Sequence, residues 1–89
     1  MESGIFFVYI LKCCDGSLYT GWTNNVTKRL AAHNSSKASK YTRARLPVEL
    51  VFTRELATKS AAMKLEYKIK SLSRKEKLLL IKNEKSRKI

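Results

Sequence analysis

Hydrophobic and polar positions follow two different periods along the chain, and the change of period divides it into predicted strands and helices. Residues 5 to 12 are almost continuously apolar and rich in β-branched and aromatic side chains, which indicates a strand covered on both faces. Residues 14 to 17 have the composition of a turn, with Gly16 available for a positive φ angle, and residues 18 to 23 continue as a second strand. Together these segments predict a β-hairpin.

A first helix is expected to follow the hairpin. Thr23 to Asn25 are good N-cap residues, and Val26, Leu30 and His33 then recur at helical spacing, so the helix should end near His33. Residues 34 to 47 form a polar, basic segment closed by a proline, and this composition indicates a loop.

The second half of the chain begins with an alternating segment. Val48 to Arg54 has the two-residue period of a third strand, in which Val48, Leu50 and Phe52 would share one face. The residues between them would occupy the opposite face.

From Thr58 the period becomes helical. The apolar stripe of this predicted helix consists of Ala62, Leu65, Ile69 and Leu72. Ser73 and Glu76 have the spacing of a capping box, so a further helix should begin there. Its inward side chains are expected to be Leu78, Leu79 and Ile81. The resulting order is β-β-α-β-α-α, and the most economical α+β architecture is a three-stranded sheet with helices packed on it.

The length of the chain limits its organisation. With 89 residues, one hydrophobic core and a single domain over residues 1–82 are expected, followed by a disordered basic tail over residues 83–89. The longest apolar run, Ile5 to Leu11, is far shorter than the roughly 20 residues that a membrane span needs. Neither a membrane segment nor a secretory signal is expected, so a cytoplasmic location is the default.

The cysteine and histidine content argues against a structural zinc site. Cys13 and Cys14 are adjacent, which is not the spacing of a redox or zinc motif, and the chain contains one histidine. Two reduced thiols near a turn are the simpler expectation.

Positive charge dominates the composition. The chain has 19 Lys and Arg against 7 Asp and Glu, a net charge of +12, which favours polyanionic partners and above all nucleic acid. Within the 34–47 segment four basic residues, with no acidic residue between them, lie around one aromatic residue. The candidate nucleic-acid-binding residues are Lys37, Lys40, Tyr41, Arg43 and Arg45. The alternative is a solvated basic face without a partner.

Several polar residues sit at positions where a buried side chain needs a partner. Arg29 and His33 are one turn apart on the first helix, so the guanidinium is expected at the edge of the core, where it would suit a phosphate. Glu66 borders the apolar stripe of the second helix, and its partner would be either a lysine or arginine, or a divalent metal ion. Tyr9 and Tyr19 lie on paired strands, where each would ordinarily be a core tyrosine.

Taken together, these residues carry a resemblance. Phe7-Val8-Tyr9, Tyr19-Thr20-Gly21, Arg29, His33 and Glu66 resemble, in this order, the signature of the GIY-YIG nuclease superfamily and of its small stand-alone bacterial members. The steps of ten residues from Tyr9 to Tyr19 and from Tyr19 to Arg29 match the spacing expected for the family, and the resemblance extends from Ile5 to Ile81. Phe7 and Thr20 depart from the naming motifs at positions where packing, more than chemistry, would change.

The resemblance implies a three-stranded antiparallel sheet flanked by helices and phosphodiester hydrolysis with one divalent metal ion, Mg²⁺ or Mn²⁺. Catalytic roles are implied for Tyr9, Tyr19, Arg29 and His33, metal binding for Glu66 and a structural role for Gly21. A phenol is a poor base at neutral pH, so its proton must be drawn off by nearby positive charge or pass to the histidine. Tyr9 is favoured as the base. Some relatives also use a late asparagine, for which Asn83 is the candidate.

Two functions from different classes fit these observations. The first is a nuclease directed by substrate structure and linked to DNA repair or recombination, with DNA as the first candidate substrate and RNA as the second. The second is a weakly catalytic or non-catalytic nucleic-acid-binding module that uses the same basic face. A protein-interaction domain is a weaker third alternative, because it leaves Arg29 and Glu66 unexplained. Specificity would come from the 34–47 segment or from a protein partner.

Overall fold

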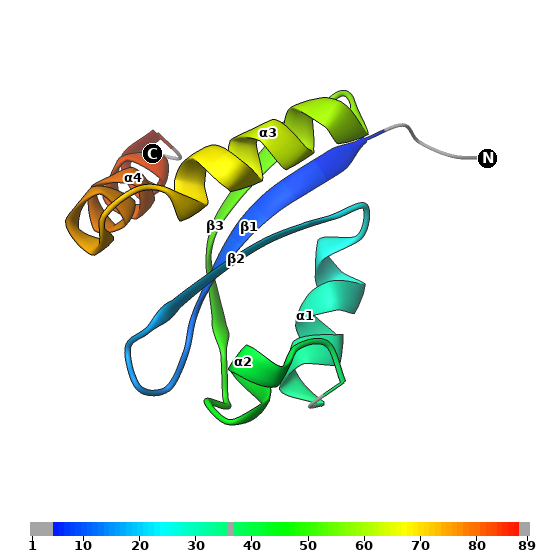
Figure 1. The fold of residues 1–89 in the computed structure, drawn as a ribbon, viewed down its shortest axis with the longest axis vertical. Coiled ribbons are helices and arrows are strands. Elements are labelled where there is room, and N and C mark those ends of the chain that lie inside the picture. The colour runs from blue at the N-terminus through cyan, green and yellow to red at the C-terminus, as the bar shows by residue number, and fades with distance from the viewer. Residues whose placement is uncertain (1–4, 36, 88–89) are drawn as a thin grey trace.

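The computed structural model describes residues 5–35 and 37–87 and contains one sheet with helices on both of its faces (Figure 1). In chain order the elements are β1 (Phe6–Lys12), β2 (Leu18–Thr23), α1 (Val26–Asn34), α2 (Lys40–Arg43), β3 (Glu49–Leu56), α3 (Lys59–Lys70) and α4 (Arg74–Arg87). The predicted order β-β-α-β-α-α is confirmed, with one addition, the 4-residue helix α2 inside the segment expected to be a loop. None of the described helices has the length and apolar character that crossing a membrane requires.

The sheet is antiparallel, and β1 lies at its centre in the order β2-β1-β3. Helices α3 and α4 lie on one side of the twisted sheet, and α1 and α2 lie on the other (Figure 1). Because β1 is covered on both faces, all of its central side chains are apolar or aromatic, as the continuous apolar run predicts. The fold class is therefore the expected α+β sandwich of one sheet between helices.

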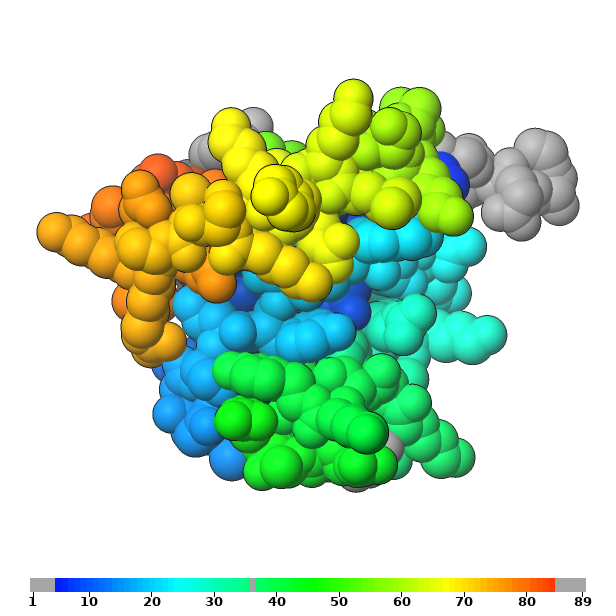
Figure 2. All heavy atoms as spheres, in the orientation of Figure 1, coloured from blue at the N-terminus to red at the C-terminus, as the bar shows by residue number. Residues whose placement is uncertain are grey.

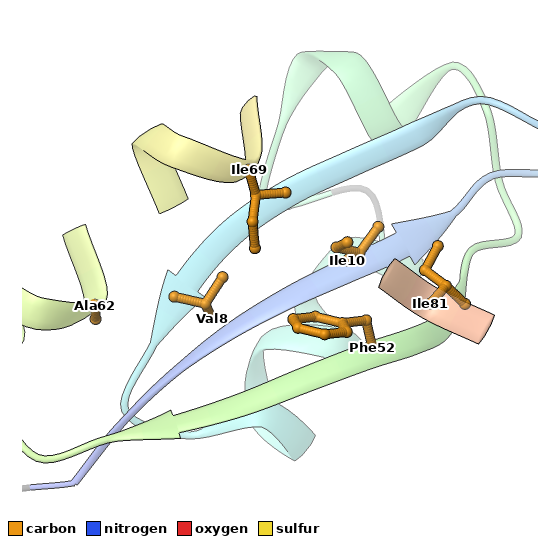
Figure 3. Packing of buried hydrophobic residues seen from close by; sticks show 6 residues of the cluster. All are labelled: Val8, Ile10, Phe52, Ala62, Ile69 and Ile81. Atoms are coloured by element: carbon orange, nitrogen blue, oxygen red, sulfur yellow. The ribbon is translucent and has the colours of Figure 1, made fainter. Parts of the chain in front are cut away.

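Two hydrophobic clusters form the core, one on each face of the sheet. Under α3 and α4 the buried residues are Val8, Ile10, Phe52, Ala62, Ile69 and Ile81 (Figure 3). On the opposite face, beneath α1, the buried residues are Tyr9, Leu11, Cys13 and Val48. Alternate residues of β1 thus belong to opposite clusters, and Tyr9 is part of the α1 side.

The hairpin turn and the helix caps follow the local sequence. Gly16 has a φ of 87°, and the Asp15 carboxylate accepts hydrogen bonds from the backbone and hydroxyl of Ser17. Ser73 and Glu76 form the expected capping box, with reciprocal hydrogen bonds of 2.8 and 3.2 Å. Both cysteines are free, as expected.

The third strand departs from the predicted alternation. The pairing of β1 with β3 shifts by one residue between Ile10, which faces Phe52, and Leu11, which faces Leu50. This irregularity inserts Val51 as an extra residue, so Phe52 packs under α3 while Leu50 packs on the α1 side. The prediction that Leu50 and Phe52 share one face was wrong because a bulge reverses the alternation.

Helix α4 also departs from the prediction. Leu78 and Leu79 are 44% and 51% exposed, whereas Leu80 and Ile81 face the core. The helix continues through Asn83 to Arg87, where a tail was expected, and residues 88–89 lie outside the described part of the chain. The inward face of α4 is selected by its packing against the core, and the helical period alone does not define this packing.

Thr20 carries a buried hydroxyl for which the described structure provides no hydrogen-bond partner. It is 4% exposed, and its neighbour Ile10 on β1 lies in the cluster beneath α3. We expect Thr20→Val to raise the free energy of unfolding by about 1 kcal/mol, because the change removes an unpaired polar atom from an apolar site. Urea denaturation would measure the difference, and an unchanged or lower stability would contradict the unpaired state. Thr53→Val on β3 is the matched control.

Candidate active site

The β1–β2 pairing places the phenol of Tyr9 directly over Gly21. The two residues face each other across the ladder, and directly opposite residues point to the same side of the sheet. A Cβ atom built on Gly21 would lie 2.6 Å from the Tyr9 hydroxyl oxygen and 2.8 Å from Cζ. Only a residue without a side chain therefore leaves room for the ring in this position.

A buried hydrogen-bonded chain runs from Tyr9 through His33 to Thr42. The Tyr9 hydroxyl lies 3.0 Å from Nε2 of His33, and Nδ1 of His33 lies 2.9 Å from Oγ1 of Thr42. Their exposed fractions are 3%, 1% and 0%, so all three are screened from bulk water. The chain joins β1, α1 and α2, three elements that are separate in the sequence.

Burial keeps both titratable members of this chain uncharged at neutral pH. The pKa of Tyr9 is raised, first by burial, then by Tyr19, and also by Glu66, while Arg29 opposes the rise. The pKa of His33 is lowered, first by burial and then by the Arg29 charge. The expectation that nearby positive charge lowers the pKa of the phenol is therefore wrong for Tyr9. The other expected route stays open, because a neutral imidazole beside a phenol is able to take the phenolic proton.

The lowered pKa of His33 makes folding stability depend on pH. The unfolded chain binds a proton on this histidine near pH 6.5, and the folded protein does so only at lower pH. We expect the free energy of unfolding to fall as the pH drops from 6.5 towards 5, by at most about 1.4 kcal/mol per pH unit. Denaturant titrations at several pH values would measure this, with His33→Gln as the control that abolishes the dependence. A flat wild-type profile would contradict it.

Tyr19 and Tyr41 extend the site as a stack of rings. The Tyr19 and His33 rings meet edge to face with their centroids 5.1 Å apart, and Tyr41 stacks on Tyr19 at 5.8 Å. The Arg45 guanidinium lies over the Tyr41 ring, 4.1 Å from its centroid, and is also paired with Asp15 at 3.1 Å. Arg45 is thus engaged in holding α2 against the hairpin turn.

The other basic residues predicted to bind nucleic acid lie at the surface beside this stack. Lys37, Lys40 and Arg43 are exposed, and none of them has an ion-pair partner among the described residues. Tyr41 is 37% exposed and is flanked by Lys40 in the same helix. The segment therefore presents free cations next to the edge of the aromatic stack.

Arg29 lies in a different environment from the expected one. It is exposed and not held at the edge of the core, because Leu30 and His33 occupy the inward face of α1. It lines a pocket of about 310 Å³ together with Lys28 and the polar residues that lead into the helix. Its charge opposes the rise in the pKa of Tyr9 and contributes to the lowered pKa of His33.

Glu66 belongs to α3, which lies on the opposite face of the sheet from α1 and α2. Figure 2 shows β2, in blue and cyan, between α3 in yellow and the α2 segment in green. The Glu66 side chain is 21% exposed, and its carboxylate pairs with Lys70 at 3.1 Å, one of the two kinds of partner that its sequence position allowed. Its negative charge raises the pKa of Tyr9, which relates it electrostatically to the buried chain.

The donor set around Glu66 suits a weakly held, hydrated cation. No group of three or more His, Cys, Asp or Glu side chains able to hold a metal occurs in the described part of the chain. Mg²⁺ is commonly bound through one or two carboxylates, waters and substrate phosphates, so a single partly exposed carboxylate fits it when nucleic acid is present. Asn83 is exposed on α4, and its side chain has no hydrogen-bond partner among the described residues.

Two polar residues that the sequence reasoning missed help to build the site. Thr42 completes the buried chain, and the available signal was Ser39, which caps α2 by accepting a hydrogen bond from the Tyr41 backbone. Asn34 closes the 34–47 segment, since its side chain exchanges hydrogen bonds of 2.9 and 3.3 Å with the backbone of Val48. Neither residue belongs to a recognisable motif.

A further surface pocket lies away from this site. A groove of about 520 Å³ runs along the outer face of α3 and is lined by Lys59, Ser60, Met63, Lys64 and Tyr67. It shares no residue with the Tyr9–His33–Thr42 chain and brings no carboxylate or histidine together. Convergent titratable side chains identify a site better than volume does, so the aromatic face beside β2 is the stronger candidate.

Comparisons with known proteins concern the domain as a whole. The sequence model of the family described as GIY-YIG catalytic domain matches residues 5–79. A UPF0213 protein of Bacillus pumilus is 54% identical over 81 residues, covering 91% of this chain and 83% of the relative. A UPF0213 protein of Natronomonas pharaonis is 53% identical over 78 residues, covering 88% and 92% of the two chains. The solution NMR structure of the UPF0213 protein BH0048 from Bacillus halodurans is 47% identical with a TM-score of 0.58, covering 88% and 83%.

Proposed function

The chain belongs to the GIY-YIG catalytic domain family, and we propose that it is a metal-dependent nuclease, which hydrolyses phosphodiester bonds in nucleic acids. The observation that carries the proposal is the buried Tyr9–His33 hydrogen bond, with the charges of Arg29 and Glu66 both acting on the phenol. A structural tyrosine has no need of two opposite charges and a neutral imidazole within reach. Phosphodiester hydrolysis uses all of them.

Tyr9 is the proposed general base, and His33 is the acceptor of its proton. As a water molecule attacks the phosphorus, it passes a proton to the Tyr9 oxygen, while the phenolic proton moves to Nε2 of His33. The imidazolium that forms then gives the proton on Nε2 to the Tyr9 oxygen while the phenol passes its own proton to the leaving oxygen, so that both side chains end in their starting states. No phenolate accumulates, so the raised pKa of Tyr9 is compatible with the role.

Arg29 and Glu66 are the residues proposed to stabilise the negative charge that develops on the phosphate. Arg29 is exposed and stays protonated, so it is available to bind the non-bridging oxygens of the scissile phosphate through parallel hydrogen bonds. Glu66 would hold Mg²⁺ or Mn²⁺, which when bound supplies Lewis-acid stabilisation of the leaving oxygen. Lys70 would release the carboxylate when the cation binds, and it would then lie free beside the substrate backbone.

The substrate is proposed to be DNA, with RNA as the second candidate. A net charge of +12 attracts the phosphate backbone, and Lys37, Lys40 and Arg43 give it unpaired contacts next to the site. These contacts read no base edges, so selection would follow the shape of the nucleic acid or a protein partner. Such shape-directed cleavage suits a role in DNA repair or recombination.

A cleavage assay with paired variants tests the proposal. Labelled single-stranded, double-stranded and branched DNA would be incubated with Mg²⁺ or Mn²⁺ and with wild type, Glu66→Ala or Arg29→Ala. We expect each variant to lose at least about 10²-fold in rate, because each loses a group that stabilises transition-state charge. Glu55→Ala and Arg74→Ala remove exposed residues of the same types elsewhere and should cleave like wild type. Cleavage that survives both site variants would identify a contaminating nuclease and refute the assignment.

A nucleic-acid-binding module without turnover is the second candidate, and the exposed cations of the 34–47 segment are the observation that favours it. In that case DNA binding would be unchanged by Glu66→Ala, and no metal-dependent product would appear with any DNA. Both candidates require affinity to fall steeply with added salt as counterions are released.

A further inference from the structure

We propose that Thr42 is a positioning residue that holds His33 in the tautomer protonated on Nδ1, so that Nε2 is free to take the proton of Tyr9. The inference rests on the proposed nuclease function for its consequence in catalysis, but not for its consequence in structure. Its basis is the buried contact between Oγ1 of Thr42 and Nδ1 of His33 at 2.9 Å.

The direction of this hydrogen bond follows from a second contact of the Thr42 hydroxyl. Oγ1 of Thr42 also lies 3.4 Å from the backbone carbonyl oxygen of Ser39, which has no proton and only accepts. The threonine hydroxyl has one proton, and the carbonyl receives it. Oγ1 therefore accepts from Nδ1–H of His33, which leaves Nε2 unprotonated and facing the hydroxyl of Tyr9.

The opposite tautomer would reverse the hydrogen bonds on both sides of His33 and would prevent it from accepting the proton of Tyr9. With the proton on Nε2, His33 would donate to Tyr9, and Thr42 would have to turn its proton from Ser39 to Nδ1. The phenolic proton would then have no acceptor within the buried site, although the three side chains would keep the same positions. Thr42 is 0% exposed, so no bulk water is available to replace its hydroxyl.

The short helix α2 gives Thr42 its fixed position. Ser39 caps the helix through a 3.1 Å bond from the Tyr41 backbone, and its carbonyl oxygen accepts from the Arg43 backbone at 3.0 Å. The Tyr41 ring stacks on Tyr19, which holds the same turn against the sheet. His33 is thus fixed between a strand residue on one nitrogen and a helix residue on the other.

Nuclear magnetic resonance of the imidazole nitrogens tests the inference directly. The chain contains one histidine, so no other imidazole overlaps its two ¹⁵N signals. Two-bond couplings to the ring protons Hδ2 and Hε1 identify Nδ1 and Nε2, and the chemical shift of each nitrogen shows whether it is protonated. At pH 7 we expect the wild type to carry its proton on Nδ1. Thr42→Val, which keeps the shape and removes the acceptor, should shift the population towards Nε2–H, and Thr42→Ser should restore Nδ1–H.

Cleavage kinetics give the second readout. Thr42→Val should lower kcat by about 10²-fold with KM unchanged, and Thr42→Ser should recover most of the rate, because only the proton-transfer step depends on the tautomer. A wild-type histidine protonated on Nε2 overturns the inference without any variant, and so does an unchanged tautomer in Thr42→Val. If no DNA is cleaved but the tautomer responds as expected, the positioning role stands and the nuclease proposal fails instead.

Discussion

Replacing Tyr9 by phenylalanine is expected to reduce the cleavage rate by about 10³-fold while leaving nucleic-acid affinity nearly unchanged. The phenol is buried, so its oxygen contributes little to binding a polyanion at the surface. Its loss removes the group that accepts the proton of the attacking water and breaks the hydrogen bond to Nε2 of His33. Single-turnover cleavage at saturating enzyme, together with a binding measurement without metal, separates the two effects.

Other tyrosines of the chain provide controls for this prediction. Tyr67→Phe changes a ring that is 78% exposed on the outer face of α3, and it should leave the rate unchanged. Tyr19→Phe keeps the ring stack between His33 and Tyr41, so we expect a smaller loss than for Tyr9→Phe. A Tyr9→Phe protein with the wild-type rate, or a Tyr19→Phe protein that loses more, would move the base from Tyr9 to Tyr19.

The substitution Gly21→Ala is expected to impair both stability and activity. The added methyl group would occupy space 2.6 Å from the Tyr9 oxygen and 2.8 Å from Cζ, and the ring is confined between β2 and His33. Displacing it should cost about 1 to 3 kcal/mol of unfolding free energy, as overpacking of a core does. It should also lower the cleavage rate by about 10²-fold, because the Tyr9 hydroxyl moves away from Nε2.

A double-mutant cycle isolates the cause. In a Tyr9→Leu background the ring is absent, so Gly21→Ala should cost little further stability if the clash with Tyr9 is responsible. Urea denaturation of the four proteins gives the coupling energy. An equal cost in both backgrounds would instead assign the effect to the β2 backbone, and the steric account of Gly21 would be wrong.

The arrangement around β2 explains how so small a domain assembles several kinds of chemistry. β2 is an edge strand of the sheet. Helix α3 lies on one face of the sheet, and the α1–α2 pair lies on the other. Tyr19 and Gly21 point to the α1 side, while Glu66 approaches from α3. Groups on opposite faces of the sheet thereby act on one phenol.

Features that depend on a few neighbouring residues were predictable from the sequence. The turn at Gly16, the capping box from Ser73 to Glu76 and the buried run of β1 all have local causes, namely a backbone conformation, two nearby hydrogen bonds and a continuous apolar strand. The spacing of the tyrosine motifs, Arg29, His33 and Glu66 was likewise enough to identify the family.

Features that depend on distant partners were not predictable in this way. The bulge that separates Leu50 from Phe52, the exposure of Leu78 and the exposure of Arg29 are set by packing between elements, which no periodicity encodes. Local residue patterns were thus sufficient to predict the side-chain types of the site and most of the elements that carry them. The assembly of Tyr9, His33 and Thr42 into one hydrogen-bonded chain depends on the packed fold, because proton transfer needs contacts near 3 Å, and these arise when strand, helix and connecting segment pack together.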